Sequence, residues 1–501
     1  MTVQSIMFQG TASDAGKSWL AAAVCRILAN RGQKVVPFKS QNMALNSFIT
    51  DKGDEMGRAQ VFQAEAAKVK PDVRMNPILL KPSTNKDSQV IVMGKVLKNM
   101  DAVSYYQFKR ELIPQIMMAY NTLAAENDVI VLEGAGSPAE INLNENDIVN
   151  MGMARMADAP VILVADIDKG GVFASIYGTI KLMPREDQQR IKGIIINKFR
   201  GDKSLLESGN KMIEKLTGIP VIGVLPMSSI DIDEEDSVSL IRKPRQKDTQ
   251  KDLDVAVIDL DKISNFTDIH SLEIQPDVSV RYVLTAEELG TPDLLIIPGS
   301  KNTNADLMAL RKNGLAEAIL RAHKDGSRVV GICGGYQILG QMLYDPTEIE
   351  SPIKEQKGLG LLDTETTFNE KKTTTQAIAK RDNYILKGYE IHMGTTKRGL
   401  NSMPFSTIQE TNGQPEKRED GAVSNDGTVI GTYLHGIFDN PYWTRRLLNR
   451  LRVAKGMAPL VDTTVSISGY KDQQYEKLAQ LFAQNVDMDK FNQILQDSTK
   501  E

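Results

Sequence analysis

A cysteine in a glycine-rich turn is the residue of this chain best placed for covalent chemistry. Residues 331–335 read GICGG, between an apolar strand that contains Val330 and an apparent helix that contains Gln337. A thiol at such a strand-to-helix turn projects from the strand end, and the helix N-terminus favours the thiolate. The pattern predicts a nucleophile elbow with Cys333 as nucleophile. A small buried thiol is the alternative, because most free cysteines are buried.

A catalytic cysteine needs a base within hydrogen-bond reach, and the chain has four histidines. We favour His435, which follows an apolar strand in TYLHGIF, over His392, which lies beside a glycine in KGYEIHMG. The backbone N–H groups of Gly299 and Ser300, at the end of LLIIPGS, are expected to form an oxyanion hole with that of Gly334. This set predicts nucleophilic catalysis by a cysteine.

A second group of residues, near the N-terminus, is suited to phosphate. GTASDAGKS, residues 10–18, follows the apolar run Ser5–Phe8 and precedes the helical run WLAAAVCRIL. Backbone N–H groups of such a loop face an anion at the helix N-terminus. In this motif Lys17 reaches the β- and γ-phosphates and Ser18 binds Mg²⁺. The loop is one residue longer than the standard one, and a chance glycine turn is the alternative.

Polar residues at later strand ends extend this expected nucleotide site. Glu133 ends the strand in VIVLEGAGS and is the expected second Mg²⁺ ligand, with a merely solvated carboxylate as the alternative. Asp166 and Asp168 in VADIDKGG lie at the edge where ligands of open α/β sheets bind. Asn197 is placed to contact a purine, although a turn-forming role fits it nearly as well. We expect ATP to contact Gly10, Thr11, Asp14, Gly16, Lys17, Ser18 and Asn197.

The elements that position these residues form two α/β series. The first has strands at Ser5–Phe8, Lys34–Phe38, Val129–Leu132, Val161–Ala165, Gly193–Ile196 and Val221–Leu225. The second has strands at Asp254–Ile258, Val278–Tyr282, Leu294–Pro298, Arg328–Ile332 and Val429–Leu434. Such short apolar runs are typical of parallel strands covered by helices. A polar linker, Arg242–Asp252, separates the series, so we expect domains at 1–240 and 252–443 and a helical tail at 444–501.

Composition limits the class of protein. A length of 501 residues is too great for one core, and a net charge of −4 without a basic block argues against nucleic-acid binding. The two cysteines, Cys25 and Cys333, are too few for a disulfide framework or a zinc site and fit a reducing compartment. No signal peptide or membrane span is visible. We expect a cytoplasmic enzyme, of undetermined oligomeric state.

Each half resembles a known family. The extended loop and the EGAG strand end resemble the dethiobiotin-synthetase-like branch of P-loop enzymes, which implies phosphorylation of a carboxylate by ATP and displacement of the phosphate by a nitrogen. GICGGYQILG, IIPGSKN and the later histidine resemble a class I glutamine amidotransferase domain. That resemblance implies attack by Cys333 on the side-chain amide of glutamine, His435 as base and Gln337 as a glutamine-binding residue. The glutamate usual two residues after the histidine is replaced by Ile437, so the third member is missing or supplied from elsewhere.

The whole chain resembles the cobyric acid synthase family. The similar segments are VPFKSQNMALNS, GRAQVFQAEAA, MNPILLKP, DKGGVFAS, NKFRGD, GYEIHMG and YLHGIFDN. The resemblance implies amidation of the b, d, e and g carboxylates of adenosylcobyrinic acid a,c-diamide, with ATP, Mg²⁺ and glutamine. The polar residues expected to meet this polyanionic corrinoid are Lys39, Gln41, Asn42, Asn46, Arg58, Gln60, Asp166 and Asp168, although solvated surface is an equal alternative for several of them.

Two other functions are consistent with parts of the sequence. A synthase of cobyrinic or hydrogenobyrinic acid a,c-diamide has the same two domains in the same order, but KSQNMALNS and the long tail favour the four-amide enzyme. A non-catalytic ATP switch of the partitioning type is the more distant alternative. Those switches carry an additional lysine early in the phosphate loop, where this chain has Ala12.

Overall fold

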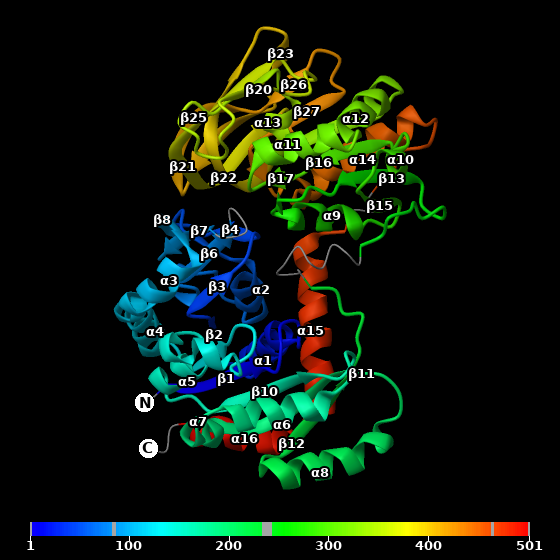
Figure 1. The fold of residues 1–501 in the computed structure, drawn as a ribbon. Coiled ribbons are helices and arrows are strands. Elements are labelled where there is room, and N and C mark those ends of the chain that lie inside the picture. The colour runs from blue at the N-terminus through cyan, green and yellow to red at the C-terminus, as the bar shows by residue number, and fades with distance from the viewer. Residues whose placement is uncertain (1–2, 83–86, 233–242, 462–464, 499–501) are drawn as a thin grey trace. The chain divides into compact units, whose positions relative to one another are not determined.

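A computed structural model of the chain describes residues 3–82, 87–232, 243–461 and 465–498 (Figure 1). The chain forms two compact units, and each is assembled from segments that are not contiguous in sequence. Unit 1 comprises 1–44, 56–233 and 471–501, and unit 2 comprises 45–55 and 234–470. Within the described ranges, no helix combines the length and apolar character that a bilayer span requires.

Unit 1 is centred on a six-stranded parallel sheet. Its strand order is β12 (Val221–Pro226), β11 (Ile191–Phe199), β10 (Val161–Asp166), β1 (Gln4–Gly10), β9 (Val129–Glu133) and β2 (Val35–Phe38). β9 and β10 flank β1, with Phe8 opposite Glu133 and Gly10 opposite Val164. The carboxyl ends of these parallel strands share one edge, which therefore carries the phosphate loop, Glu133 and Asp166. All six strands were predicted from their apolar runs.

Helices cover this sheet and share one apolar core with it. α1 (Lys17–Asn30) and α2 (Arg58–Ala66) share this core with the C-terminal helices α15 (Ile467–Asn485) and α16 (Met488–Asp497). Figure 1 shows α15 running beside α1. The remaining helices of eight or more residues in this unit are α4 (Ile113–Glu126), α6 (Val172–Leu182) and α8 (Glu207–Thr217). A smaller sheet, which the sequence did not indicate, contains β3 (Gln41–Met43), β6 (Ile78–Pro82), β7 (Asp87–Val92) and β8 (Lys95–Asp101).

Unit 2 contains a seven-stranded sheet of which five strands are parallel. The order is β15 (Val278–Val283), β13 (Leu253–Ile258), β16 (Leu294–Ile297), β18 (Arg328–Ile332) and β27 (Val429–Thr432), followed by antiparallel β26 (Ala422–Ser424) and β23 (Ser402–Met403). The five parallel strands match the second predicted series. The main helices are α11 (Thr303–Lys312), α12 (Leu315–Lys324), α13 (Gly334–Leu339) and α14 (Pro441–Ala454). The expected α/β class is confirmed in both units.

A second sheet in unit 2 was missed from the sequence. Two long antiparallel strands, β21 (Thr364–Arg381) and β22 (Tyr384–Arg398), dominate it. β19 (Met342–Tyr344), β20 (Glu355–Lys357), β24 (Ser406–Thr411), β25 (Gln414–Asp420) and β28 (Leu434–His435) complete it. The threonine-rich strand β21 is largely polar and half-buried, so it lacks the continuous apolar run that marks the parallel strands.

The compact units differ from the expected domains at two places. The expected tail is divided, because α14 packs into the core of unit 2 whereas Lys471 onward belongs to unit 1. Residues 45–55, expected in the first domain, belong to unit 2. They contain β4 (Ser47–Ile49) and the first residue of its pairing partner β5 (Glu55–Gly57). Amphipathic helices and short hairpins bury their apolar faces wherever a complementary surface exists, which sequence order does not reveal. Of the expected linker, Arg242 lies outside the described residues.

Candidate active sites

Cys333 occupies a strained turn between β18 and α13. Its backbone has φ 53° and ψ −109°, a conformation that costs free energy for any residue with a Cβ. The turn brings the helix tightly onto the sheet, since a Cβ on Gly335 would lie 1.9 Å from the carbonyl oxygen of Ile297. The Cys333 thiol donates a hydrogen bond to the carbonyl of Ile391 at 3.4 Å. This is the geometry of a nucleophile elbow.

His435 is buried beside this cysteine and is held by a carboxylate. Its Nδ1 lies 2.6 Å from Oδ2 of Asp268, whose Oδ1 accepts a hydrogen bond from the N–H of Gly436 at 2.9 Å. Burial alone would lower the pKa of His435, but the Asp268 carboxylate, followed by the neighbouring Cys333, raises it to about 10. The ring is therefore an imidazolium at neutral pH and can act as a proton donor.

His392, the rival candidate base, has a different environment. Its ring stacks on Tyr433 with centroids 3.7 Å apart. Burial, and next the positive charge of Arg418, lower its pKa to about 3, so the ring is neutral across the physiological range. Of the two histidines, His435 is the one held by a carboxylate, and we retain it as the proposed partner of Cys333.

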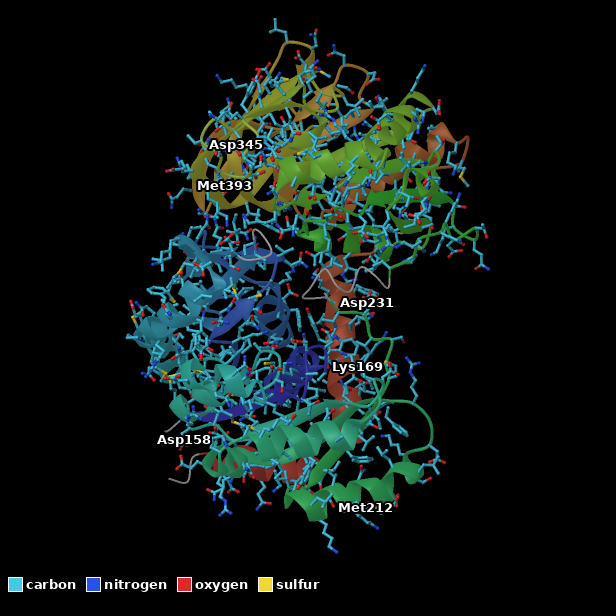
Figure 2. All side chains as sticks on the ribbon, viewed as in Figure 1. Asp158, Lys169, Met212, Asp231, Asp345 and Met393 are labelled. Carbon is cyan, nitrogen blue, oxygen red and sulfur yellow. The ribbon has the colours of Figure 1, made fainter. Side chains whose placement is uncertain are left out.

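The predicted oxyanion and glutamine residues gather around the elbow. A Cβ on Gly334 would lie 2.8 Å from the backbone nitrogen of Ser300, so these two backbone segments are in contact. The Gln337 side chain is fixed at both ends: it accepts from Thr303 Oγ1 at 2.9 Å and donates to the carbonyl of Met393, labelled in Figure 2, at 3.1 Å. The site therefore has rigid polar walls around the thiol.

In unit 1 the side chain of Lys17 folds back onto the phosphate loop and bonds to backbone carbonyl groups. Lys17 Nζ donates to the carbonyl oxygens of Ala12 at 3.1 Å and Gly136 at 3.0 Å. Gly16 has φ 101° and lies against Asn197, whose Nδ2 donates to the carbonyl of Ala15 at 2.9 Å. Asn197 thus supports the loop that precedes α1. A bound phosphate would take over the interactions of Lys17 with the loop carbonyls.

Glu133 is the centre of a buried polar cluster beside this loop. Ser18 Oγ donates to Glu133 Oε1 at 2.8 Å, and Lys39 Nζ lies 3.0 Å from the same oxygen. On the other carboxylate oxygen, Gln63 Nε2 donates at 2.5 Å and Gln60 Nε2 at 3.5 Å. The hydroxyl and carboxylate oxygens of Ser18 and Glu133 are ligand types that Mg²⁺ prefers, so these two residues would hold the ion that accompanies ATP. The described residues contain no group of three or more acidic, histidine or cysteine side chains that would bind a metal alone.

The other expected corrinoid and nucleotide residues are placed less closely together. Asp166 pairs with Lys198 at 2.9 Å, and the exposed Asp168 pairs with Arg200 at the same distance. Asn42 Nδ2 donates to Gln60 at 3.3 Å, which links it to the Glu133 cluster. Gln41 accepts a hydrogen bond from Tyr105, and Arg58 is the first residue of α2. Thr11 and Asp14 lie in the phosphate loop.

Asn46 differs from the other expected corrinoid residues. It is buried in unit 2, whereas the Glu133 cluster belongs to unit 1.

Three residues of these sites were not found from the sequence. Asp268 occupies the orienting position that sequence reasoning looked for after His435, but it comes from a turn 167 residues earlier in the chain. Gln63 contacts Glu133 from α2, and Tyr389 stacks on His435 with centroids 5.0 Å apart. Of these three, only Gln63 could have been predicted, because it lies one helical turn after the expected Gln60 and so on the same face of α2.

The fold and the family models define a class: a nucleotide-binding unit and a glutamine amidotransferase unit in one chain. Residues 6–239 match the CobQ/CobB/MinD/ParA nucleotide binding domain, and residues 254–443 match the CobB/CobQ-like glutamine amidotransferase domain.

Curated relatives narrow this class. The chain is 97% identical over 501 residues, 100% of both chains, to the cobyric acid synthase of Limosilactobacillus reuteri strain DSM 20016. It is 60% identical to that of Streptococcus sanguinis strain SK36, covering 99% of this chain and 100% of the relative. It is 58% identical to that of Listeria innocua, covering 98% and 97%. The chain belongs to the cobyric acid synthase family. It is a glutamine-dependent ligase of cobalamin biosynthesis, and the alternative of a non-catalytic switch is wrong.

Replacing Asp268 by asparagine should reduce glutamine hydrolysis without changing the shape of the site. We expect kcat/KM to fall by about 10²–10⁴-fold, because the amide loses the charge that orients and stabilises the imidazolium. The His435 pKa falls, so the imidazolium is lost at a lower pH and the basic limb of the pH profile moves to lower pH. Glutamate release measured from pH 5 to 10 tests this. Asp261→Asn, which changes an exposed carboxylate nearby, is the control, and an unaltered profile in Asp268→Asn would refute the assignment.

Proposed function

We propose that this enzyme amidates the b, d, e and g carboxylates of adenosylcobyrinic acid a,c-diamide, giving adenosylcobyric acid. The observation that carries this proposal is the full-length identity of 97% to a cobyric acid synthase, which spans both sites rather than one domain. ATP would activate each carboxylate, and glutamine would supply each nitrogen.

Glutamine hydrolysis begins with the Cys333 thiolate. Its sulfur attacks the side-chain amide carbon of glutamine, and the developing oxyanion is stabilised by backbone N–H groups from Gly299, Ser300 and Gly334. The His435 imidazolium donates its proton to the departing nitrogen, which leaves as ammonia. Water, deprotonated by the neutral imidazole, then cleaves the thioester and releases glutamate. Asp268 and the buried position of His435 support this sequence of proton transfers.

Carboxylate activation takes place at the phosphate loop. A substrate carboxylate oxygen attacks the γ-phosphorus of ATP, which forms an acyl phosphate and releases ADP. Ammonia then attacks the acyl carbon and phosphate leaves. Lys17 and the loop N–H groups stabilise the charge of the transferring group, which is most of what such a reaction requires of a protein.

Mg²⁺ would be held by Ser18 and Glu133, and it supplies charge neutralisation at the β- and γ-phosphates. Lys39 forms an ion pair with Glu133, and its ammonium group would contact an anionic substrate if a cation neutralised that carboxylate instead. Lys39, Gln41 and Asn42 follow β2 directly, and we assign them to the corrinoid carboxylates. Asp166 and Asp168 are engaged by Lys198 and Arg200, and they are weaker candidates. A cytoplasmic location fits the free thiols of Cys25 and Cys333.

An assay with individual corrinoids tests the number and position of the amides. The enzyme, ATP, Mg²⁺ and glutamine labelled with ¹⁵N in the amide are incubated with adenosylcobyrinic acid a,c-diamide, and the incorporated nitrogens are counted by mass spectrometry. Four labelled amides are expected from the a,c-diamide. Incorporation of two into cobyrinic or hydrogenobyrinic acid, with none into the a,c-diamide, would instead identify the a,c-diamide synthase.

A further inference from the structure

The hairpin Leu45–Glu55 packs in unit 2 although its sequence lies within the nucleotide-binding half of the chain. It is well ordered internally. The N–H of Thr50 donates to the carbonyl of Asp54, and the N–H of Gly53 donates back to Thr50, each at 2.8 Å. The positive φ of Gly53, 79°, permits this tight turn. The segment is therefore a hydrogen-bonded hairpin and not an irregular loop.

Its first contact leads to the carboxylate that holds His435. The N–H of Ser47 donates to Oδ1 of Asn265 at 3.1 Å. Asn265 begins the turn Phe266–Ile269, and its carbonyl accepts from the N–H of Asp268 at 3.1 Å. The hairpin thus supports the turn that carries Asp268.

Its second contact leads to a face of the histidine ring. The ring of Phe48 packs on Tyr389 with centroids 5.7 Å apart. Tyr389 in turn stacks on His435, with centroids 5.0 Å apart and planes 14° from parallel. Tyr389 is only 6% exposed, and Phe48 is one of the side chains that bury its ring.

A third contact leads to the nucleophile. Ile49 packs in one apolar cluster with Tyr389 and Ile391. The carbonyl oxygen of Ile391 lies 3.4 Å from the sulfur of Cys333. Three consecutive residues of the hairpin therefore reach Asp268, His435 and Cys333, each through a single intervening residue.

Separate interactions fasten the hairpin to β21. Glu55 and Lys372 form an ion pair in which the glutamate side chain is 1% exposed. Thr374 Oγ1 donates to the carbonyl of Gly53 at 3.1 Å, and Gln376 donates to the carbonyl of Ile49. These contacts do not involve Phe48, so the hairpin keeps its place when that side chain is shortened.

We propose that Phe48 is a positioning residue for glutamine hydrolysis, and that the hairpin Leu45–Glu55 is a built part of the glutaminase site. Misplacement of catalytic groups by about 1 Å can cost about 10²-fold in rate, and the hairpin fixes all three groups at once. The inference rests on the proposed role of Cys333, His435 and Asp268. It makes glutamine hydrolysis depend on residues that lie about 200 positions before β13, the first parallel strand of the amidotransferase domain.

Phe48→Ala in the full-length enzyme tests the proposal. We expect kcat for glutamate release to fall about 10- to 100-fold, with a smaller change in KM, because geometry and not glutamine binding is lost. The basic limb of the pH profile should move to lower pH as His435 loses its fixed relation to Asp268. Phe48→Tyr keeps the ring and should restore most of the activity. Corrinoid amidation with ammonium salts should be retained and shows that the variant is folded.

Matched variants make each outcome decisive. Lys52→Ala, at the exposed tip of the same hairpin, should hydrolyse glutamine like the unaltered enzyme. Phe48→Leu replaces Phe48→Ala if the latter is unstable, since it keeps apolar bulk but removes the ring. Glutamine hydrolysis within twofold of normal with an unchanged pH profile, or equal losses in Phe48→Ala and Phe48→Tyr, would overturn the proposal. Full glutaminase activity in Cys333→Ala would instead overturn the underlying mechanism.

Discussion

Cys333→Ala should abolish amidation from glutamine and leave amidation from ammonia intact. The variant lacks the sulfur that forms the thioester, so we expect glutamate release to fall at least about a thousandfold. Ammonium salts supply the nitrogen directly, and the phosphate-loop site, which lies in the other unit, is unchanged. The measurement is corrinoid amide formation with each nitrogen source, together with glutamate release.

The second cysteine is the matched control. Cys25 is fully buried on α1, and burial raises the pKa of its thiol, so it is unreactive at neutral pH. Cys25→Ala should keep glutamine-dependent activity, and Cys333 alone should be alkylated by a glutamine-like electrophile. Loss of ammonia-dependent amidation in Cys333→Ala would show that this cysteine serves more than glutamine hydrolysis.

Lys17→Ala should have the opposite pattern, with both glutamine- and ammonia-dependent amidation lost. Removing one preorganised cationic donor from a phosphoryl-transfer site costs about 10²–10³-fold in kcat. Glutamate release should continue, because no residue of the Cys333 site belongs to the phosphate loop. Product formation from ATP, corrinoid and ammonium measures the loss.

Folding of this variant must be checked, since Lys17 also bonds to Ala12 and Gly136 within the loop. An unchanged melting temperature and retained glutaminase activity show an intact fold. Lys34→Ala, which removes an exposed lysine just before β2, is the control and should be fully active. Ammonia-dependent amidation at a normal rate in Lys17→Ala would contradict the assignment of this loop to ATP.

Local patterns were sufficient to predict the parts of the fold with strong sequence signals. The strands of both parallel sheets are continuous apolar runs, and the turns at Gly16 and Cys333 depend on glycines whose spacing is visible in the sequence. The residues at their carboxyl ends follow from the geometry of parallel sheets. For that reason Lys17, Ser18 and Glu133 could be grouped from the sequence alone.

Contacts that depend on chain path were beyond sequence reasoning. Asp268 lies in NFTDIH, where nothing distinguishes a catalytic carboxylate from a turn former. Its role follows only from its 2.6 Å distance to His435. Likewise, Phe48 is one aromatic residue in a polar segment, and its position on Tyr389 depends on the hairpin crossing into unit 2. The long β21–β22 pair was missed because a polar, half-buried strand has no continuous apolar run.

Because residues 471–501 belong to unit 1, this unit cannot finish folding until they have been synthesised. Arg26 on α1, 1% exposed, is paired with Asp472 and Glu476 of α15, and the ring of Tyr475 lies over its guanidinium. At about 5–20 residues per second, a ribosome needs roughly 20–90 s to pass from α1 to α15. During that interval α1 lacks the contacts that α15 supplies, so the nucleotide-binding unit is completed only after residues 234–470 of the other unit have been synthesised.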